Sequence, residues 1–229
     1  MELRQEAYNR SAMDLGFVFI ISLGMIPLNW SPCVAAPARD TKHEVMVGDQ
    51  WTYDLTDEIT NTPSATVTYS ITDVSNKETT IAVTKLGGSG TWLEVYDESW
   101  GRKLNNTWKS VPNDGLSLKY PVAVGDHWSI NGTDNNLVKG GAFRHLGTSK
   151  VVAEEKLEVP AGTYETFKVV SDQKWVGVNG QGQKGEIHAE TWYAPEIDRI
   201  VKRTFKSKLQ GHLLEQFEMV LTDNSPVGN

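Results

Sequence analysis

Three side chains that could do chemistry alternate along one short segment of the chain: Glu186, His188 and Glu190. Alternate residues of a β-strand point to the same face, so a strand here would bring the imidazole and the two carboxylates together. These groups are ligands for transition metals, and they also serve in hydrolases whose sites are assembled from distant loops. The alternative is a solvated sheet face, which ordinary surface composition favours. We therefore predict no metal site and keep the three residues only as weak candidates.

Other catalytic and nucleotide-binding patterns are incomplete in this sequence. The segment 87–91 lacks the second glycine of the Gly-x-Ser-x-Gly elbow of serine hydrolases. In the glycine-rich segment 177–184, Gln183 stands where a P-loop has its lysine. Neighbouring carboxylates such as Asp97 and Glu98 would point to opposite faces of a strand and could not act as an acid/base pair. The sequence thus predicts no cofactor and leans away from an enzyme, with a site built from distant loops as the open alternative.

Tryptophan is the remaining side chain with a possible binding role. Seven of the eight tryptophans follow residue 38: Trp51, Trp92, Trp100, Trp108, Trp128, Trp175 and Trp192. An exposed indole can stack on a sugar ring or line an apolar cavity, whereas a buried one only supplies core area. We expect Trp100 and Trp108 to be the exposed pair, because both lie beside a polar segment that runs from Arg102 to Asn106. Trp175 and Trp192 are further binding candidates.

The N-terminus has the pattern of a secretory signal peptide. Arg4 and Arg10 precede an apolar run at 15–28, and Pro32 and the small residues at 34–38 follow it. The sequence Ala-Pro-Ala at 36–38 is typical of a cleavage site, so residues 1–38 are predicted to form a signal helix that is removed before Arg39. A membrane anchor is the alternative, but the run is shorter than the roughly 20 apolar residues that a span needs. The acidic residues before it also leave Met13 open as the true start.

Cysteine and charge limit the remaining possibilities. Cys33 is the only cysteine, and Trp30-Ser31-Pro32 before it does not fit a bacterial lipidation site. After cleavage no thiol would remain for disulfides, catalysis or zinc binding. The chain would keep 20 basic and 26 acidic residues, a net charge of −6. This balance argues against nucleic acid as a partner, and against electrostatic docking on anionic lipid headgroups.

The region after residue 38 is dominated by segments typical of β-strands. They alternate apolar and polar residues or are rich in β-branched and aromatic ones. Strands are predicted at 65–72, 79–86, 92–96, 150–153, 164–171, 187–193, 200–205 and 213–221. The last of these also has helical spacing at Leu213, Phe217 and Leu221, but its alternation favours a strand. Turn residues separate the segments at 61–63, 87–90, 112–115 and 140–141. The pattern predicts an all-β, antiparallel meander curled into an open barrel or a sandwich.

One short pattern occurs twice. The segment 47–53 (VGDQWTY) is repeated at 124–130 (VGDHWSI), each with a Gly-Asp turn and a strand that opens on tryptophan. We predict that Gly48 and Gly125 form equivalent turns, that Asp49 and Asp126 stabilise those turns, and that Trp51 and Trp128 are both largely buried. The chain would then consist of a first β-meander half at 39–118, a second half at 119–223 that continues the same sheet, and a flexible tail at 224–229.

Two further segments carry a family resemblance. They are 159–169 (VPAGTYETFKV), with a turn at Gly162, and 191–202 (TWYAPEIDRIVK), with a strand end at Pro195. Together with the turn at 124–128, they resemble an exported bacterial β-sheet family catalogued as a domain of unknown function and close to proteins labelled TapB-like. The resemblance covers about residues 118–206. It implies a location in the cell envelope or outside the cell and a curled antiparallel sheet, and it implies no particular activity.

The sequence therefore favours an exported, non-enzymatic β-protein, periplasmic or extracellular, that binds an apolar or lipid-like molecule or an envelope partner protein. A carbohydrate-binding module that uses exposed tryptophans is one alternative. A hydrolase with a site around Glu186, His188 and Glu190 is another.

Overall fold

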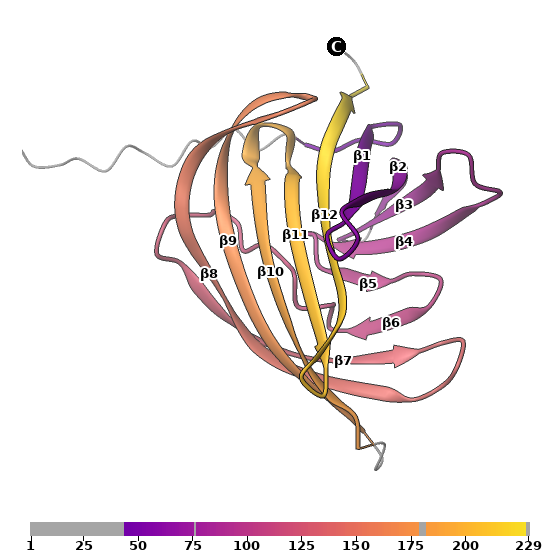
Figure 1. Cartoon of the computed structure of the whole chain (residues 1–229). Coiled ribbons are helices and arrows are strands. Elements are labelled where there is room, and N and C mark those ends of the chain that lie inside the picture. Colours follow the sequence, from indigo (N-terminus) through magenta and orange to yellow (C-terminus); the bar gives the residue numbers. More distant parts are fainter. Residues whose placement is uncertain (1–43, 76, 179–181, 228–229) are drawn as a thin grey trace, which may run out of the picture. The chain divides into compact units, whose positions relative to one another are not determined.

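The computed structural model describes residues 44–75, 77–178 and 182–227 (Figure 1). The predicted signal helix at 1–38 and its cleavage site lie outside these residues. In the described ranges, no helix is long and apolar enough to cross a membrane.

Twelve antiparallel strands and one 3-10 turn, η1, form the described part of the chain. Their bounds are β1 Gln50–Asp57, β2 Thr62–Ser75, β3 Glu78–Lys85, β4 Thr91–Asp97, β5 Arg102–Leu104, β6 Trp108–Val111, β7 His127–Asn136, β8 Ala142–Val159, β9 Gly162–Gly177, β10 Lys184–Ala194, η1 Pro195–Ile197, β11 Arg199–Leu209 and β12 His212–Ser225. Each strand pairs with the next, as in a meander. The all-β prediction is confirmed, and the segment at 213–221 is a strand.

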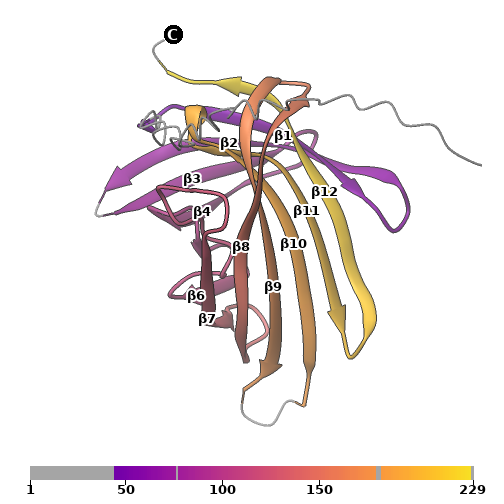
Figure 2. The ribbon, with the colours of Figure 1, turned by 90° about the vertical axis from the view of Figure 1, so that its left-hand side faces the viewer.

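The sheet is closed, which corrects the expectation of an open barrel or a sandwich. β1 pairs with β12 from Gln50 opposite Ser225 to Asp57 opposite Phe217, with a bulge between Thr52 and Tyr53. Without this pairing both strands would leave a row of bare backbone groups at an edge. The strands are long and coiled, and this brings the two edges together. Figure 2 shows β8 to β12 as one tall wall, with β3, β4, β6 and β7 gathered on the other side.

Successive turns of a meander lie at alternate ends of the barrel, so the two ends are built from different segments. We call one of them the plugged end; it carries the loops 98–101 and 112–126, the β8–β9 turn and η1. We call the other the open end; it carries the turns 58–61, 86–90, 105–107, 137–141 and 210–211.

Large side chains fill the plugged end. Trp100, Leu118 and Val122 come from its loops and pack with Trp51 and Tyr193 in one buried cluster. The β8–β9 hairpin arches over this end toward β12 (Figure 1), and the Ala161 N–H donates to the Leu221 carbonyl at 3.3 Å. The apolar core of the molecule therefore lies toward this end of the barrel.

The two repeated turns have the same geometry. Gly48 and Gly125 have φ of 100° and 97°, a region that favours glycine. The Gly48 N–H donates to the Ile71 carbonyl at 2.9 Å, and the Gly125 N–H donates to the Val151 carbonyl at 3.0 Å. An aspartate closes each turn by accepting a hydrogen bond from the backbone N–H three residues earlier. The two segments thus play the same local role, while the duplication of whole halves stays a prediction.

The tryptophans that follow these turns differ in burial. Trp51 is 1% exposed, because Trp100 from the 98–101 loop and Arg199 at the start of β11 cover its ring. Trp128 is only half-buried, although it packs against the same core. The expectation of two largely buried tryptophans therefore holds in full only for Trp51. Cover by residues that are distant in the sequence, rather than the turn itself, decides how deep each ring lies.

Candidate functional site

A cavity of about 550 Å³ occupies the barrel lumen toward the open end. We call it the lumen cavity. Side chains that point inward from β5 to β12 line it, together with two residues of the 112–126 loop and with Lys139 and Gln183 from the turns at the open end. Its principal lining residues are Arg102, Trp108, Asp114, Leu116, Asp134, Phe143, His145, Gln173, Trp175, Ile187, Phe205, Leu214 and Glu215. The volume is in the range of small-molecule sites.

One side of the lumen cavity is an aromatic wall. Trp108 and Phe143 meet edge to face with ring centroids 5.7 Å apart, and Phe143 and Trp175 do so at 5.4 Å. Gly185 lies opposite Trp175 in the β9–β10 pair, and a Cβ at Gly185 would come within 2.4 Å of the indole ring. The absence of a side chain at position 185 therefore makes room for Trp175, as is usual where glycine interrupts a strand.

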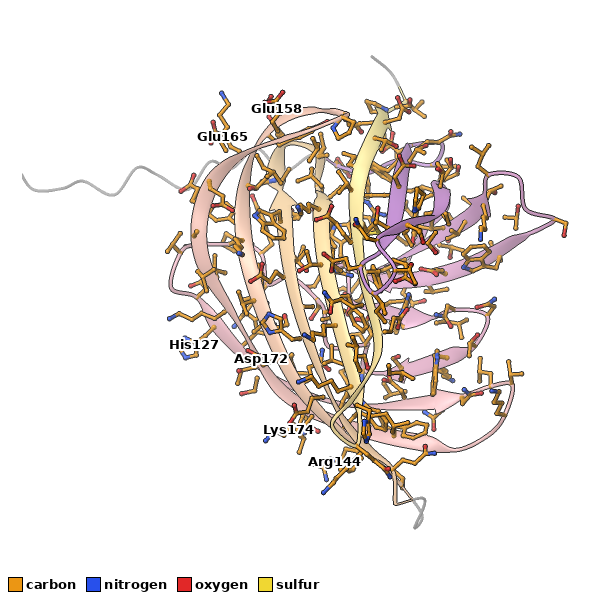
Figure 3. The ribbon with its side chains drawn as sticks, viewed as in Figure 1. His127, Arg144, Glu158, Glu165, Asp172 and Lys174 are labelled. Atoms are coloured by element: carbon orange, nitrogen blue, oxygen red, sulfur yellow. The ribbon has the colours of Figure 1, made fainter. Side chains whose placement is uncertain are left out.

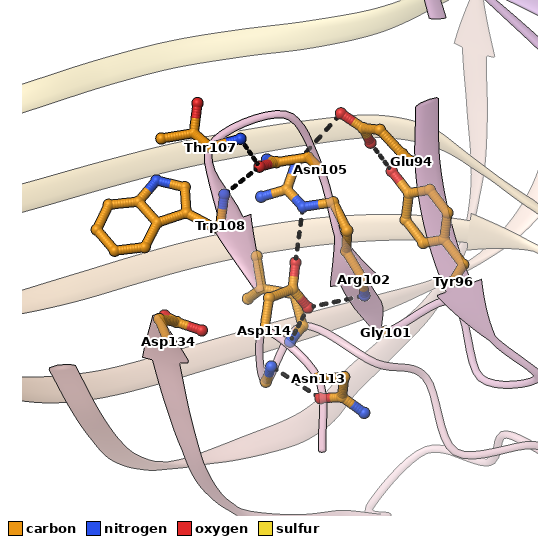
Figure 4. A network of polar contacts seen from close by, with 12 residues as sticks. Glu94, Tyr96, Gly101, Arg102, Asn105, Thr107, Trp108, Asn113, Asp114 and Asp134 are labelled. Carbon is orange, nitrogen blue, oxygen red and sulfur yellow. Dashed lines mark hydrogen bonds and ion pairs between the residues drawn. The ribbon is translucent and has the colours of Figure 1, made fainter. Parts of the chain in front are cut away.

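Charged side chains form a network beside this wall (Figure 4). The Arg102 guanidinium lies 3.8 Å from the carboxylates of both Glu94 and Asp114. Burial by itself lowers the pKa of Arg102, but Asp114 and Glu94 outweigh burial and raise that pKa above its usual value. The Tyr96 hydroxyl donates to Glu94, and burial together with this carboxylate holds the pKa of Tyr96 well above its usual value. Arg102 is thus a fixed cation in the lumen.

A second polar group is incompletely satisfied. Asp134 and His145 lie on paired strands, with 3.6 Å between an aspartate oxygen and Nδ1 of the imidazole. Oδ1 of Asp134, Nε2 of His145 and both polar atoms of the Gln173 amide are buried and have no hydrogen-bond partner among the described residues. Buried polar atoms without partners are uncommon and cost free energy. Burial also raises the pKa of Asp134, and the Ser110 hydroxyl and His145 only partly oppose this.

Glycines bring these polar groups close to the backbone. A Cβ at Gly132 would lie 2.0 Å from Nε2 of His145, so only glycine fits opposite this imidazole. Gly115, with φ of 76°, lies beside the Gln173 amide, and a Cβ there would come within 3.1 Å of its oxygen. The local sequence therefore shapes pockets around His145 and Gln173, which supports a role for both residues beyond packing.

The four tryptophans predicted to bind a ligand are not on one surface. Trp100 is buried rather than exposed, which corrects the prediction: its indole N–H donates to Asp198 at 3.0 Å, and its ring stacks on Arg199. Trp192 is also buried, between Lys168 and Lys202 on the face of β10 opposite to Tyr193. Trp108 and Trp175 are half-buried, and both belong to the aromatic wall of the lumen cavity. No flat platform of Trp100 and Trp108 exists, since the loop at 98–101 turns Trp100 into the core.

The three residues of the alternating acidic and histidine segment do share one face of β10. Of Glu186, His188 and Glu190, the last two have a partner on β9: His188 lies 2.8 Å from Asp172, and Glu190 lies 2.8 Å from Lys168. Among the described residues, no group of three or more histidine, cysteine or carboxylate side chains has the arrangement of a metal site.

Sequence analysis missed the polar residues of the lumen. Asp134, His145 and Gln173 stand at inward positions of β7, β8 and β9, where an apolar residue is expected. The available clue was the alternation Phe143-x-His145-x-Gly147 and Gln173-x-Trp175, in which a polar side chain shares a face with an aromatic one. This clue could be used only if the strand at 150–153 had been extended back to residue 142.

Comparison with known proteins gives the fold but no activity. No family model matches the chain, and no curated protein matches it. The structure is similar to a predicted lipoprotein from Parabacteroides distasonis, with 12% identity, a TM-score of 0.54, and 79% of this chain and 96% of that chain covered. It is also similar to a predicted exported protein with a YmcC-like fold from Bacteroides fragilis, with 13% identity, a TM-score of 0.52, and 81% and 99% covered. The chain thus shares a fold with these two proteins, while its likeness to the TapB-like family stays a prediction.

Proposed function

We propose that this chain is an exported, non-enzymatic binding protein that holds a small amphiphilic molecule in the lumen cavity. The observation that carries the proposal is the set of buried polar atoms without partners on Asp134, His145 and Gln173, next to a wall of three aromatic rings. A ligand with an apolar body and a polar end would pack on the rings and offer hydrogen bonds to these atoms.

The composition of the lumen cavity supports an amphiphile over a purely apolar molecule. Its apolar side is formed by Trp108, Phe143, Trp175 and Phe205, and its polar side by Arg102, Asp134 and Gln173. A site with buried polar groups rejects a ligand that cannot bond to them, because those groups would stay unpaired. The sequence-based expectation of an apolar or lipid-like ligand is therefore narrowed to one with a polar end. The alternative of an envelope partner protein stays a prediction.

Export is supported by two independent features. The N-terminus has a signal-peptide pattern, and the two similar structures belong to a predicted lipoprotein and a predicted exported protein. An envelope location would also bring a small binding barrel close to lipids and other amphiphiles.

The two alternatives drawn from the sequence have less support. A carbohydrate module would need coplanar exposed rings, whereas Trp100 is buried and Trp108 faces the lumen. A hydrolase around His188 would need a nucleophile beside the imidazole. The contact recorded for His188 is instead an ion-pair distance to the exposed Asp172. We therefore place the binding role in the lumen and not on the outer face of β10.

Native mass spectrometry of the protein purified from the envelope fraction tests the proposal first. We expect a bound small molecule that organic extraction removes, and a second measurement with a fluorescent amphiphile, N-phenyl-1-naphthylamine, locates the site. Trp175→Ala should weaken binding of this probe about tenfold or more, since a ring contact in the cavity is lost.

Leu146→Ala is the matched control for this experiment. Leu146 neighbours His145 in the sequence but is exposed on the opposite face of β8. The control should bind the probe as the parent chain does. Equal probe affinity in Trp175→Ala, Gln173→Leu and the parent chain would count against the lumen as the binding site.

A further inference from the structure

The open end exposes apolar side chains at four of its hairpin turns. We call the following residues the apolar rim: Ile59, Leu86, Leu137, Val138, Leu213 and Leu214. Leu86 is 76% exposed in a turn that otherwise consists of glycine and serine, and Val138 is 70% exposed next to Lys139. Turns normally carry polar residues, and an apolar set gathered around one end indicates an interaction surface.

Several lysines beside the apolar rim form no ion pair with another described residue. Lys139, Lys184 and Lys208 lie at or next to the open-end turns, and no ion pair involves them among the described residues. Lys206 lies two residues before Lys208 on β11 and therefore on the same face of the sheet. Arg144 and Lys174 project from the same end of the wall in Figure 3. These six cations form a basic cluster. Three carboxylates lie among them: Glu186, between Lys174 and Lys208 in register, Asp172 in the same outer pocket, and Glu58 beside Lys206.

Nearer the plugged end, lysines of the same wall form ion pairs with carboxylates. There Lys168 pairs with Glu190 at 2.8 Å, and Lys202 pairs with Glu218 at 2.6 Å. The positive charge of the wall is thus paired with carboxylates at one end and exceeds the neighbouring negative charge at the other. Charges farther away than about 10 Å are largely screened at physiological salt, so the net negative charge of the chain does not cancel this local excess.

We infer that the open end docks on an anionic lipid surface, with the apolar rim in the headgroup region and the basic cluster on the acidic headgroups. Apolar side chains flanked by lysines are the combination that binds such an interface, since the lysine stems also cover apolar surface. The expectation against lipid headgroups rested on the net charge of the whole chain, whereas this inference rests on the local distribution of charge at the open end.

The apolar rim is continuous with the lumen cavity. Leu214 belongs to the rim and Lys139 to the basic cluster, and both line the cavity. Docking in this orientation would therefore point the mouth of the cavity at the lipid. The inference stands on surface residues and holds whether or not the lumen binds an amphiphile.

Site-specific fluorescence tests the orientation. In a Cys33→Ser background, Val138→Cys at the open end and Val47→Cys at the plugged end each carry the dye NBD. Both positions are exposed turn valines, so they are matched. With vesicles of phosphatidylcholine and phosphatidylglycerol, we expect a blue shift and quenching by brominated lipid at position 138 and no change at position 47.

Three results would overturn the inference. One is a response at position 47 alone, which would mean that the N-terminal segment, joined to the barrel beside Val47, brings the plugged end to the lipid. Another is an equal response to vesicles of phosphatidylcholine alone. The third is a blue shift at position 138 without vesicles that grows with protein concentration, because a second copy of the chain would then cover the rim.

Charge reversal tests the basic cluster separately. We expect partitioning into the anionic vesicles to fall about a hundredfold in the variant with Lys139→Glu, Lys184→Glu and Lys208→Glu. The reason is that each surface lysine adds a similar favourable free energy of attraction to the acidic headgroups. The control reverses Lys119, Lys150 and Lys156, which are exposed but lie toward the plugged end. The control should partition as the parent chain does, and an equal loss in both variants would contradict the assignment.

Discussion

The plugged end and the open end of the barrel belong to the same strands, yet each end buries an aspartate in a different way. At the plugged end, one oxygen of the buried Asp198 accepts hydrogen bonds from the Tyr193 hydroxyl at 2.6 Å and the Trp100 indole at 3.0 Å. At the open end, Oδ1 of Asp134 and both polar atoms of Gln173 are buried without partners among the described residues, whereas two unpartnered atoms at the plugged end, Nε1 of Trp51 and Nε of Arg199, belong to a ring and a guanidinium that stack on one another. A satisfied network rigidifies a core, whereas unsatisfied groups cost stability unless something else binds them. The difference between Asp198 and Asp134 is the one expected if the plugged end holds the fold together and the open end is arranged for a ligand.

Truncation of one tryptophan at each end should show the largest contrast. Trp51→Ala removes a ring that is 1% exposed, and we expect a loss of about 3–5 kcal/mol in the free energy of unfolding. Trp175→Ala removes a half-buried ring that faces a cavity, and we expect a loss of only about 1–2 kcal/mol. Urea denaturation followed by circular dichroism measures both. Equal losses would mean that the open end is as firmly packed as the plugged end.

Asp198→Ala should come next in size. It leaves the Tyr193 hydroxyl and the Trp100 indole without their acceptor, and it places alanine at a φ of 46°. We expect a loss of about 2–4 kcal/mol, which is the range for two buried donors left unpaired. Asp198→Asn is the matched control, because it keeps an oxygen that can accept both bonds. If asparagine were as damaging as alanine, the charge rather than the hydrogen bonds would be the important property.

Asp134→Asn should raise the free energy of unfolding at neutral pH, whereas the preceding variants lower it. Burial raises the pKa of Asp134 above 3.8, so the folded chain holds this proton more tightly than the unfolded chain. Ionisation of the carboxyl group therefore lowers the stability of the fold as pH rises above about 4. Asparagine removes this penalty. We expect a gain of about 1 kcal/mol at neutral pH that disappears as pH falls toward 4. Denaturation across this pH range measures it, and a loss at neutral pH would show that the contact with His145 stabilises the fold instead.

The smallest effect is expected on the apolar rim. Val138→Ser changes a side chain that is 70% exposed, so the free energy of unfolding should stay within about 0.5 kcal/mol. Val83→Ala, at a fully buried position of β3, should cost about 2 kcal/mol and shows that the assay resolves the difference. A marked loss in Val138→Ser would mean that the rim serves folding and weaken the case for a docking surface.

The all-β class and the main strands could be predicted because alternation is a local property. The segments at 65–72 and 187–193, for example, fall inside β2 and β10. β8 was predicted only at 150–153 but extends from 142 to 159, because Gly147 and the charged residues 154–156 are poor strand formers in isolation. Pairing on both sides overrides that weakness, since β8 lies between β7 and β9.

Closure and the lumen could not be predicted in the same way. Whether β1 meets β12 depends on the accumulated twist of the whole sheet, which no local pattern records. Trp100 was misplaced for a similar reason: its neighbours Arg102 and Asn105 are polar, but Asp198, the residue that accepts its hydrogen bond, is almost a hundred positions away. The candidate site consists of residues from eight strands and three connecting segments, so it exists only once the barrel is closed.

The seam between β1 and β12 has a consequence for the order of folding. Every other neighbouring pair can form as a local hairpin or across one loop, but the seam joins Gln50 to Ser225. Contacts so distant in sequence form slowly, because the entropy of closing the loop must be overcome before any bond repays it. We therefore expect ring closure to be the late, rate-limiting event. Until it occurs, the nascent sheet presents two unpaired edges, and a chaperone that covers them would protect the sheet from pairing with other chains.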